Sequence, residues 1–254
     1  MRKCIHFYNE SFLTRGTHRK MKKGIILTFL ILGISINSQA QYLNIQQHAD
    51  FGKERHYFTT TLEGLGFDGW GSWFGFIDAD HRSLTSHTGS SDWQFGVQFV
   101  YFELNRYFNL SKILPGKVFQ NLEVTIQYND SPASFIQPAY LAGITWDNLF
   151  PKYLYAHLEF LLRKEEQQRL AWQITGVWSK EFHLKQTLWS FQGYFDYWAN
   201  DAGLWWMSEP QLLINLQPLG ISKRLWMGTE WELNWSQNGS YNQINPTLFL
   251  RYDF

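Results

Sequence analysis

The last fourteen residues of the chain, Tyr241 to Phe254, read YNQINPTLFLRYDF. From Ile244 onward every second residue is apolar, which gives the series Ile244, Pro246, Leu248, Leu250, Tyr252 and Phe254. Between them, with Phe249 as the one exception, lie polar or charged residues: Asn245, Thr247, Arg251 and Asp253. Period-two alternation is the spacing of a β-strand with two different faces. The segment therefore predicts a strand with one apolar and one polar side.

A phenylalanine closes this strand on its apolar face. Such an ending resembles the C-terminal signature of bacterial outer-membrane β-barrels. In those barrels the apolar face of a strand contacts lipid and the polar face lines a water-filled lumen. We therefore expect the lipid bilayer of the outer membrane as one partner of the chain, and the barrel-assembly machinery, acting on Phe254, as another. Arg251 and Asp253 are expected in the lumen.

The composition agrees with a membrane barrel. The chain has 254 residues, a length that a single β-barrel domain can use in full. Aromatic residues make up 19% of the chain, whereas charged residues are only 17%, against about 25% in typical globular domains. Many aromatic residues fall near the ends of predicted apolar strand faces, as in interfacial girdles, namely Tyr140, Trp146, Trp189, Tyr197, Trp206, Trp226, Trp235 and Tyr252.

Residues 21–41, MKKGIILTFLILGISINSQAQ, read as a secretory signal peptide. Two lysines precede an apolar run at 24–36, and Ser38-Gln39-Ala40 forms a small-x-small cleavage site. A transmembrane helix is the alternative, but it needs roughly 20 apolar residues. We predict a signal peptide at 21–40 and a barrel at 41–254. Residues 1–20 are interpreted as an upstream extension of the start at Met21 or as an extended basic region of the signal peptide.

Removal of residues 1–40 changes the charge and the cysteine content. It takes away seven of 22 Lys and Arg and one of 22 Asp and Glu, so 15 bases and 21 acids remain and the net charge falls from +0 to −6. The only cysteine, Cys4, is lost as well. We therefore expect no disulfide, thiolate metal site, lipid anchor or cofactor. The lack of basic clusters also argues against a nucleic-acid partner.

Twelve segments with period-two patterning follow Gln41, separated by turn residues such as Asn129-Asp130-Ser131-Pro132. They lie at 42–50, 55–65, 70–80, 92–105, 118–129, 137–147, 153–163, 169–180, 187–199, 205–217, 225–235 and 241–254. Each is near the 9 to 11 residues of a tilted membrane-spanning strand. The chain is thus predicted to be all-β, a 12-stranded antiparallel up-and-down transmembrane barrel with both termini in the periplasm.

Three positions fit the barrel less simply. Pro210 and Pro246 fall inside predicted strands, although a closed barrel has no free edge for proline. We expect bulges or strand ends there. Segment 92–105 changes phase along its length, which predicts a bulge or a shifted register.

The predicted polar face carries an excess of acids: Glu63, Asp78, Asp80, Glu103, Glu123, Asp147, Glu159, Asp196, Glu209, Glu230, Glu232 and Asp253. The basic residues that can be placed inward are Arg163 and Arg251. An acidic pore favours cations and repels anions. The alternative is that each acid is a solvated wall residue that pairs with a nearby arginine.

An enzymatic alternative rests on His81-Arg82-Ser83, which is similar to the His-x-Ser element of outer-membrane lipases and deacylases. A real site requires the pair at the lipid-facing rim, whereas here it falls in a predicted loop, 81–92, which is also a candidate lid or partner site. The eight histidines show no metal-ligand spacing, so neither a metal nor a catalytic residue is assigned.

Three strands carry a family resemblance. Residues 70–80, WGSWFGFIDAD, look like the strand of the Tsx-type nucleoside-specific channels in which an aromatic run leads into Asp-Ala. Residues 102–108, FELNRYF, are similar to the Glu-x-x-Arg strand of that family, and 189–198, WSFQGYFDYW, resemble its Gly/aromatic/Asp strand. The overall layout most resembles an uncharacterised outer-membrane family related to those channels.

The resemblance implies a narrow barrel that passes nucleosides, with Asp78, Glu103, Arg106 and Asp196 at motif positions. Phe74, Phe76 and Tyr194 are the inward aromatic residues near those acids, and a base can stack on such rings; alternatively, they plug the lumen. We therefore predict a channel for passive diffusion of small solutes. A closed barrel that serves as a structural or binding platform, or a lipid-modifying enzyme, is the alternative.

Overall fold

The computed structural model describes residues 39–52, 55–81, 97, 99–133, 136–239 and 242–254. The strands are β1 (Gln39–Asp50), β2 (Tyr57–Phe67), β3 (Gly71–His81), β4 (Phe99–Asn109), β5 (Leu122–Asp130), β6 (Ala139–Trp146), β7 (Tyr155–Glu165), β8 (Ala171–Leu184), β9 (Thr187–Asn200), β10 (Gly203–Ser208), β11 (Gln211–Asn215), β12 (Leu225–Ser236) and β13 (Gln243–Asp253). Three 3₁₀ turns lie between strands: η1 (Leu110–Lys112), η2 (Lys117–Phe119) and η3 (Gln217–Leu219). Among the described residues, no helix has the length and apolar character needed to cross a membrane.

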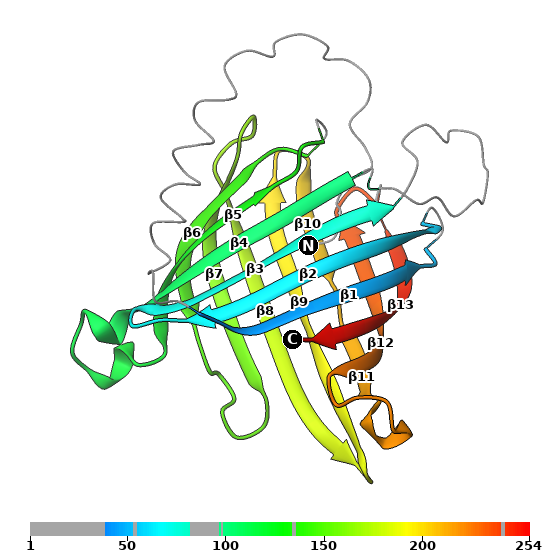
Figure 1. Ribbon diagram of the computed structural model, residues 1–254. Coiled ribbons are helices and arrows are strands. Elements are labelled where there is room, and N and C mark those ends of the chain that lie inside the picture. Colours follow the sequence, from blue (N-terminus) through cyan, green and yellow to red (C-terminus); the bar gives the residue numbers. More distant parts are fainter. Residues whose placement is uncertain (1–38, 53–54, 82–96, 98, 134–135, 240–241) are drawn as a thin grey trace.

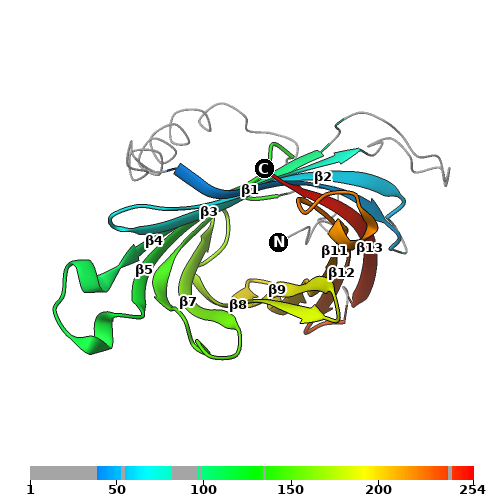
Figure 2. The same cartoon turned by 60° about the horizontal axis from the view of Figure 1, so that its bottom comes forward.

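The strands form one closed antiparallel barrel (Figures 1 and 2). Sequence neighbours pair along the sheet, and β13 returns to pair with β1 from Asn44↔Asp253 to Asp50↔Thr247. Strands β10 and β11 both lie between β9 and β12, so they are two halves of one wall position. The barrel therefore has twelve strand positions, and the predicted fold is confirmed.

The interruption between β10 and β11 comes from Pro210. The register toward β9 and β12 is the same before and after it, so no extra residue is inserted. Pro210 lacks an N–H for the sheet, although its carbonyl still accepts a hydrogen bond from Trp231 N at 3.1 Å. The site is therefore a strand end, one of the two outcomes expected for a proline there.

Pro246 lies inside β13 but beyond the end of its neighbour. The pairing of β13 with β1 ends at Asp50↔Thr247, and the Pro246 carbonyl accepts from Phe51 N at 3.0 Å. The nitrogen and carbonyl of one strand residue point to the same side. The missing N–H of Pro246 therefore faces the turn after β1, where the ladder has already ended.

Two predicted boundaries are corrected or left open. The fourth strand runs from Phe99 to Asn109 rather than 92–105, and its described pairings with β3 and β5 show no register shift. The first part of the predicted segment, residues 92–96 and 98, lies outside the described residues, so the predicted bulge is not tested there. Residues 1–38 and 82–92, which hold most of the predicted signal peptide and of loop 81–92, lie outside the described residues. Strand β1 begins at Gln39, two residues before the predicted start of the barrel.

The two faces of the wall differ as predicted. On β12, Glu230, Glu232 and Asn234 are buried, whereas Met227 and Trp231 are exposed. The same alternation recurs around the barrel, and its exposed apolar side chains include Leu43, Ile45, Leu62, Ile77, Ile126, Ile144, Phe160, Leu162, Leu248 and Leu250. The outer surface is thus apolar and the interior holds the polar residues.

Trp226 lies inside rather than outside, and Phe249 lies on the inner face that its parity predicts. Trp226, predicted for an outer girdle, is buried with Phe249 and Leu213 on the inner face. It alternates with Met227, which is exposed, so the strand period itself turns it inward. Phe249 breaks the alternation of the last strand because its ring stacks on His48, with the ring centroids 4.4 Å apart.

Candidate functional site: the lining of the barrel

Twelve of the thirteen residues predicted to line the lumen lie at inward positions of the alternating strands or at the β10–β11 interruption. Their cross-strand partners and their polar or aromatic contacts all belong to the inner face. They are Phe74, Phe76, Asp78, Asp80, Glu103, Glu123, Glu159, Tyr194, Asp196, Glu209, Glu230 and Arg251. Whether they contact a solute stays a prediction.

Arg106 is the exception, and its predicted lumen position is wrong. It lies between the inward residues Asn105 and Tyr107, and opposite Ile126, which is 42% exposed on the outer face. Its guanidinium binds Asp68 at 2.8 Å, in the turn between β2 and β3. The motif resemblance placed Arg106 inside, but strand alternation places it outside.

The Arg106–Asp68 pair has a clear electrostatic signature in the turn. Burial raises the pKa of Asp68, but hydrogen bonds from Arg106 and from the N–H groups of Trp70 and Gly71 lower it more. The net pKa therefore lies below the ordinary aspartate value. Arg106 also donates to the Ser72 carbonyl at 2.9 Å, so the pair ties the β2–β3 turn to β4.

Threonine hydroxyls bridge the carboxylates near the ends of β1, β2 and β3. Thr59 donates to Asp50 at 2.9 Å and lies 3.0 Å from Asp80. Thr61 donates to Asp78 at 2.5 Å. These acids are thus held by short polar side chains from the neighbouring strand, because paired residues of an antiparallel sheet share a face.

On β12, which is separated from β1 by β13, Glu232 is the centre of a second group. Arg55, from the β1–β2 turn, binds Glu232 Oε1 at 2.5 Å. Asn234 and Asn245 donate to the same oxygen at 2.6 and 3.3 Å. Arg55 was missed as an inward base, although the predicted segment 55–65 gives it the same parity as Glu63; in the structure it precedes β2.

Aromatic rings flank the acids halfway along β3 and β4. Phe74, Phe76 and Tyr101 form a series with ring centroids 6.2 and 6.0 Å apart. Tyr101 donates to Glu103 at 2.5 Å. Across the barrel, Asp196 accepts from Gln173 at 3.0 Å and from Thr175 at 2.5 Å. The middle of the barrel thus combines rings and carboxylates.

Glu159 on β7 accepts hydrogen bonds through both of its carboxylate oxygens. Its two oxygens accept from Tyr107 at 2.9 Å and from Gln127 at 2.5 Å. His157 Nε2 lies 3.0 Å from Glu159 Oε1. Such a saturated carboxylate braces β4, β5 and β7 against one another, which is the structural alternative considered for each acid.

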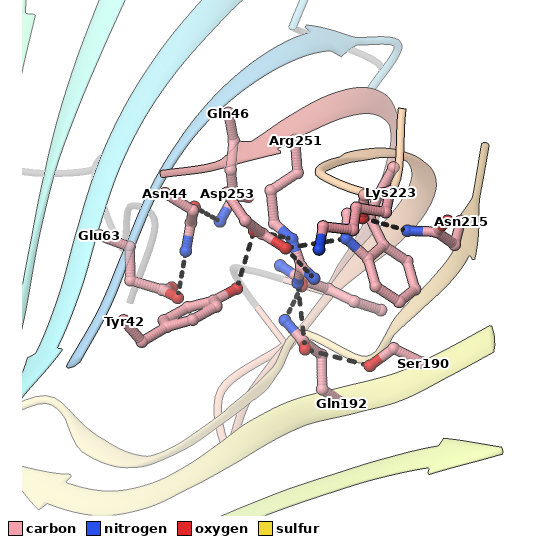
Figure 3. Close-up of polar contacts among 12 residues, drawn as sticks. Tyr42, Asn44, Gln46, Glu63, Ser190, Gln192, Asn215, Lys223, Arg251 and Asp253 are labelled. Carbon is pink, nitrogen blue, oxygen red and sulfur yellow. Dashed lines mark hydrogen bonds and ion pairs between the residues drawn. The ribbon is translucent and has the colours of Figure 1, made fainter. Parts of the chain in front are cut away.

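Arg251 organises the end of the barrel that holds the C-terminus (Figure 3). It pairs with Asp253 at 3.0 Å, and its guanidinium lies 4.9 Å from the Trp226 ring and 5.8 Å from the Tyr42 ring. It also donates to Gln192 of β9 at 3.4 Å. The predicted inward pair Arg251–Asp253 is therefore a bonded cluster that reaches across β12 and β11. Trp226 and Tyr42 were missed, although alternation from Glu230 and Asn44 points to both.

The described residues show no metal site, and they test only half of the enzymatic element, because His81 ends strand β3 rather than lying in the predicted loop. No three His, Cys, Asp or Glu side chains in that part of the chain are grouped so that they could hold a metal ion. His81 lies opposite Phe58 and within 2.9 Å of the Thr60 hydroxyl. Ser83, the predicted nucleophile, lies outside the described residues.

Comparisons with known proteins agree with this architecture. A family model described as "Domain of unknown function (DUF5020)" matches residues 40–254. No curated protein matches the chain. Among solved structures, a KdgM porin is similar at 9% identity over 84% of this chain and 99% of that one, with a TM-score of 0.50. A NanC porin matches at 10% identity over 84% and 100% of the two chains, with a TM-score of 0.46. The first shows a shared barrel fold.

Proposed function

We propose that this chain, which belongs to the DUF5020 family, forms an outer-membrane channel for the passive diffusion of small solutes. One observation carries the proposal: a closed barrel has an apolar exterior and an interior lined by polar and charged residues. An apolar exterior suits lipid, and a polar interior suits water and solutes. The shared fold with a KdgM porin supports the same conclusion.

The proposed pore prefers cations. Carboxylates project inward from most of the strands, whereas the guanidiniums of Arg55, Arg163 and Arg251 each lie beside an inner-face carboxylate, that of Glu232, Glu165 and Asp253 respectively. Fixed negative charge in a narrow, partly dehydrated pore lowers the energy of cations and repels anions. Twelve strands lie between the eight that side chains fill and the sixteen of wide porins, so the conduit is narrow.

Planar-bilayer recording tests this proposal. Under a KCl gradient, the purified barrel should conduct, and its reversal potential should have the sign of a K⁺-selective pore. The double variant Glu103→Gln/Glu209→Gln should lower the K⁺/Cl⁻ permeability ratio at least twofold. Asp201→Asn removes the same kind of charge from an exposed turn and should leave the ratio unchanged. An anion-selective pore contradicts the cation preference.

Nucleosides are the finer proposal for the solute. It rests on the Tsx-type resemblance and on the aromatic series Phe74, Phe76 and Tyr101 beside Glu103, since a base can stack on rings and hydrogen-bond to carboxylates. Added nucleoside should reduce the single-channel current in the same recordings. A current that no nucleoside alters removes this substrate and leaves the channel.

A closed barrel is the second candidate, and one observation favours it. Leu213, Trp226 and Phe249 pack together on the inner face, with Leu188 against them. Apolar side chains inside a barrel fill space and exclude water. If the folded protein gives no current in the bilayer, this platform function replaces the channel.

A further inference from the structure

Four buried oxygen atoms of the inner wall have no hydrogen-bond partner in the described part of the chain. They are Asp196 Oδ2, Glu232 Oε2, Asn234 Oδ1 and the Tyr194 hydroxyl. Asp196 and Glu232 are each 1% exposed, and Asn234 is 6% exposed. Buried polar atoms usually have partners, and each exception calls for an explanation, such as an absent ligand. The four residues that carry these atoms also lie close together in the sheet, on β9 and β12.

The four residues surround a small area of the wall. Met207 of β10 pairs with Asp196 on one side and with Asn234 on the other. One step along the strand, Glu209 N donates to the Tyr194 carbonyl, and the same register sets Glu209 opposite Glu232. Adjacent strands lie about 4.8 Å apart, so the outer columns are roughly 10 Å apart. We call this group of six residues, Tyr194, Asp196, Met207, Glu209, Glu232 and Asn234, the β9–β12 patch.

The charge around the patch is negative. Glu103 from β4 and Glu230 from β12 lie close enough to interact electrostatically with Tyr194, as do Asp196 and Glu209. Together with Glu232 these are five carboxylates, and the arginines that approach them are Arg163, near Glu103 and Asp196, and Arg55, on Glu232. An additional cation therefore gains energy at this place.

The unpartnered atoms define the kind of cation. Two carboxylate oxygens and an amide oxygen can only accept hydrogen bonds, and an ammonium group offers three N–H donors and no acceptor. A bare metal ion needs a compact ligand set, and the described residues provide no group of three that could hold one. The acceptors lie instead on two columns separated by Met207, which is fully buried and apolar. This layout suits two ammonium groups joined by methylenes.

We propose that the β9–β12 patch binds the ammonium groups of an aliphatic diamine or polyamine. The proposal names a class of solute for the proposed channel. It rests on that channel function, because a solute must reach the patch through the lumen. One ammonium group lies against Asp196 and Tyr194, and the other lies against Glu232 and Asn234. The methylene chain between them contacts Met207. Charge-assisted hydrogen bonds of this kind are roughly twice as strong as neutral ones.

Isothermal titration calorimetry of the barrel in detergent tests the site, with spermidine and cadaverine as probes. Wild type should bind both, and an N-acetylated cadaverine should bind at least tenfold more weakly, since it has lost one ammonium group. Asp196→Asn should weaken binding at least tenfold, because it replaces Oδ2 by an amide donor. Its other oxygen can still accept from Gln173 and Thr175, so the variant keeps the contacts of the fold. Asp201→Asn, in an exposed turn, should bind as wild type does.

Glu232→Gln tests the side of the patch formed by Glu232 and Asn234, and it should also weaken binding of both probes in the calorimeter. Circular dichroism and the boiling-dependent shift on SDS gels check that each variant is folded. If wild type binds neither probe, or if folded Asp196→Asn binds both as well as wild type does, the proposal is overturned. Calorimetry requires no open pore. A barrel that binds amines without conducting therefore contradicts only the channel, and a cation-selective channel that binds no amine contradicts only the patch.

Discussion

At the residue scale, the buried pair Arg106–Asp68 makes the sharpest prediction for stability. Its side chains are 3% and 2% exposed. Removing one partner of a buried pair leaves a charge without compensation and costs about 3–5 kcal/mol. Arg106→Met should lower the free energy of unfolding by about that amount, measured by urea titration of the barrel in lipid vesicles. Arg169→Met breaks the exposed pair with Asp201 and should have little effect.

The same pair sets a pH dependence. The folded-state pKa of Asp68 is depressed, so its contribution is fully present above the unfolded aspartate pKa of about 3.9. This contribution of ionised Asp68 to the folding stability is lost as the pH falls through the depressed pKa of Asp68 in the folded state. The stability difference between wild type and Arg106→Met should therefore be largest at neutral pH and shrink below about pH 4. A difference that stays constant into acid contradicts an electrostatic origin.

Single residues also show what the sequence could and could not predict. The inward positions of Glu230 and Glu232 could be predicted, because the alternation within a single strand is enough to assign its two faces. Arg55 and Asp68 lie in turns, and their partners Glu232 and Arg106 are 177 and 38 residues away. Such contacts depend on barrel closure and turn geometry, which a local pattern does not contain.

At the scale of elements, Gly193 of β9 provides the space that the interruption between β10 and β11 requires. It lies opposite Pro210, and a Cβ there would come within 2.5 Å of the Glu209 carbonyl oxygen and 2.9 Å of Pro210 Cα. Its φ of 156° is also unfavourable for other residues. Because backbone atoms give way little, Gly193→Ala should destabilise the barrel by about 1–3 kcal/mol in the same unfolding assay.

Gly69 gives the matched control for this substitution. It lies in the β2–β3 turn, and a Cβ there meets nothing within 4 Å. Gly69→Ala should therefore leave the unfolding midpoint near that of wild type. Equal midpoints for the two alanine variants would contradict the idea that Gly193 accommodates the interruption.

Strand positions were predictable to a large extent, and strand ends were less so. All twelve predicted segments overlap an observed strand, because each strand carries its own period. The end of β4 at Asn109 and the start of β5 at Leu122 were displaced from 105 and 118. Residues 110–121 between them contain two 3₁₀ turns, and the apolar residues Val118 and Phe119 of the second turn resemble the start of a strand.

At the scale of the whole molecule, the net charge of −6 for residues 41–254 does not show how acids and bases are distributed in space. Many acids lie on the inner wall, whereas six exposed bases lie in turns at the end of the barrel that holds the C-terminus: Lys112, Lys117, Lys152, Lys185, Lys223 and Arg224. Composition alone cannot reveal this distribution of charge, because the distribution depends on which turns lie at the same end of the barrel. The antiparallel meander supplies that information.

Closure of the barrel by β13 leads to a prediction for Phe254. Its N–H donates to the Leu43 carbonyl at 3.0 Å, and its ring is 63% exposed, packed edge-on to Tyr252 at 5.5 Å. One hydrogen bond and an exposed ring contribute little to the final fold. If assembly machinery recognises this ring, Phe254→Ala should lower the amount of folded barrel in cell membranes several-fold and leave refolding from urea into detergent nearly unchanged. Phe254→Tyr keeps the ring and should restore assembly. Equal losses in cells and in detergent would indicate instead that Phe254 acts only within the fold.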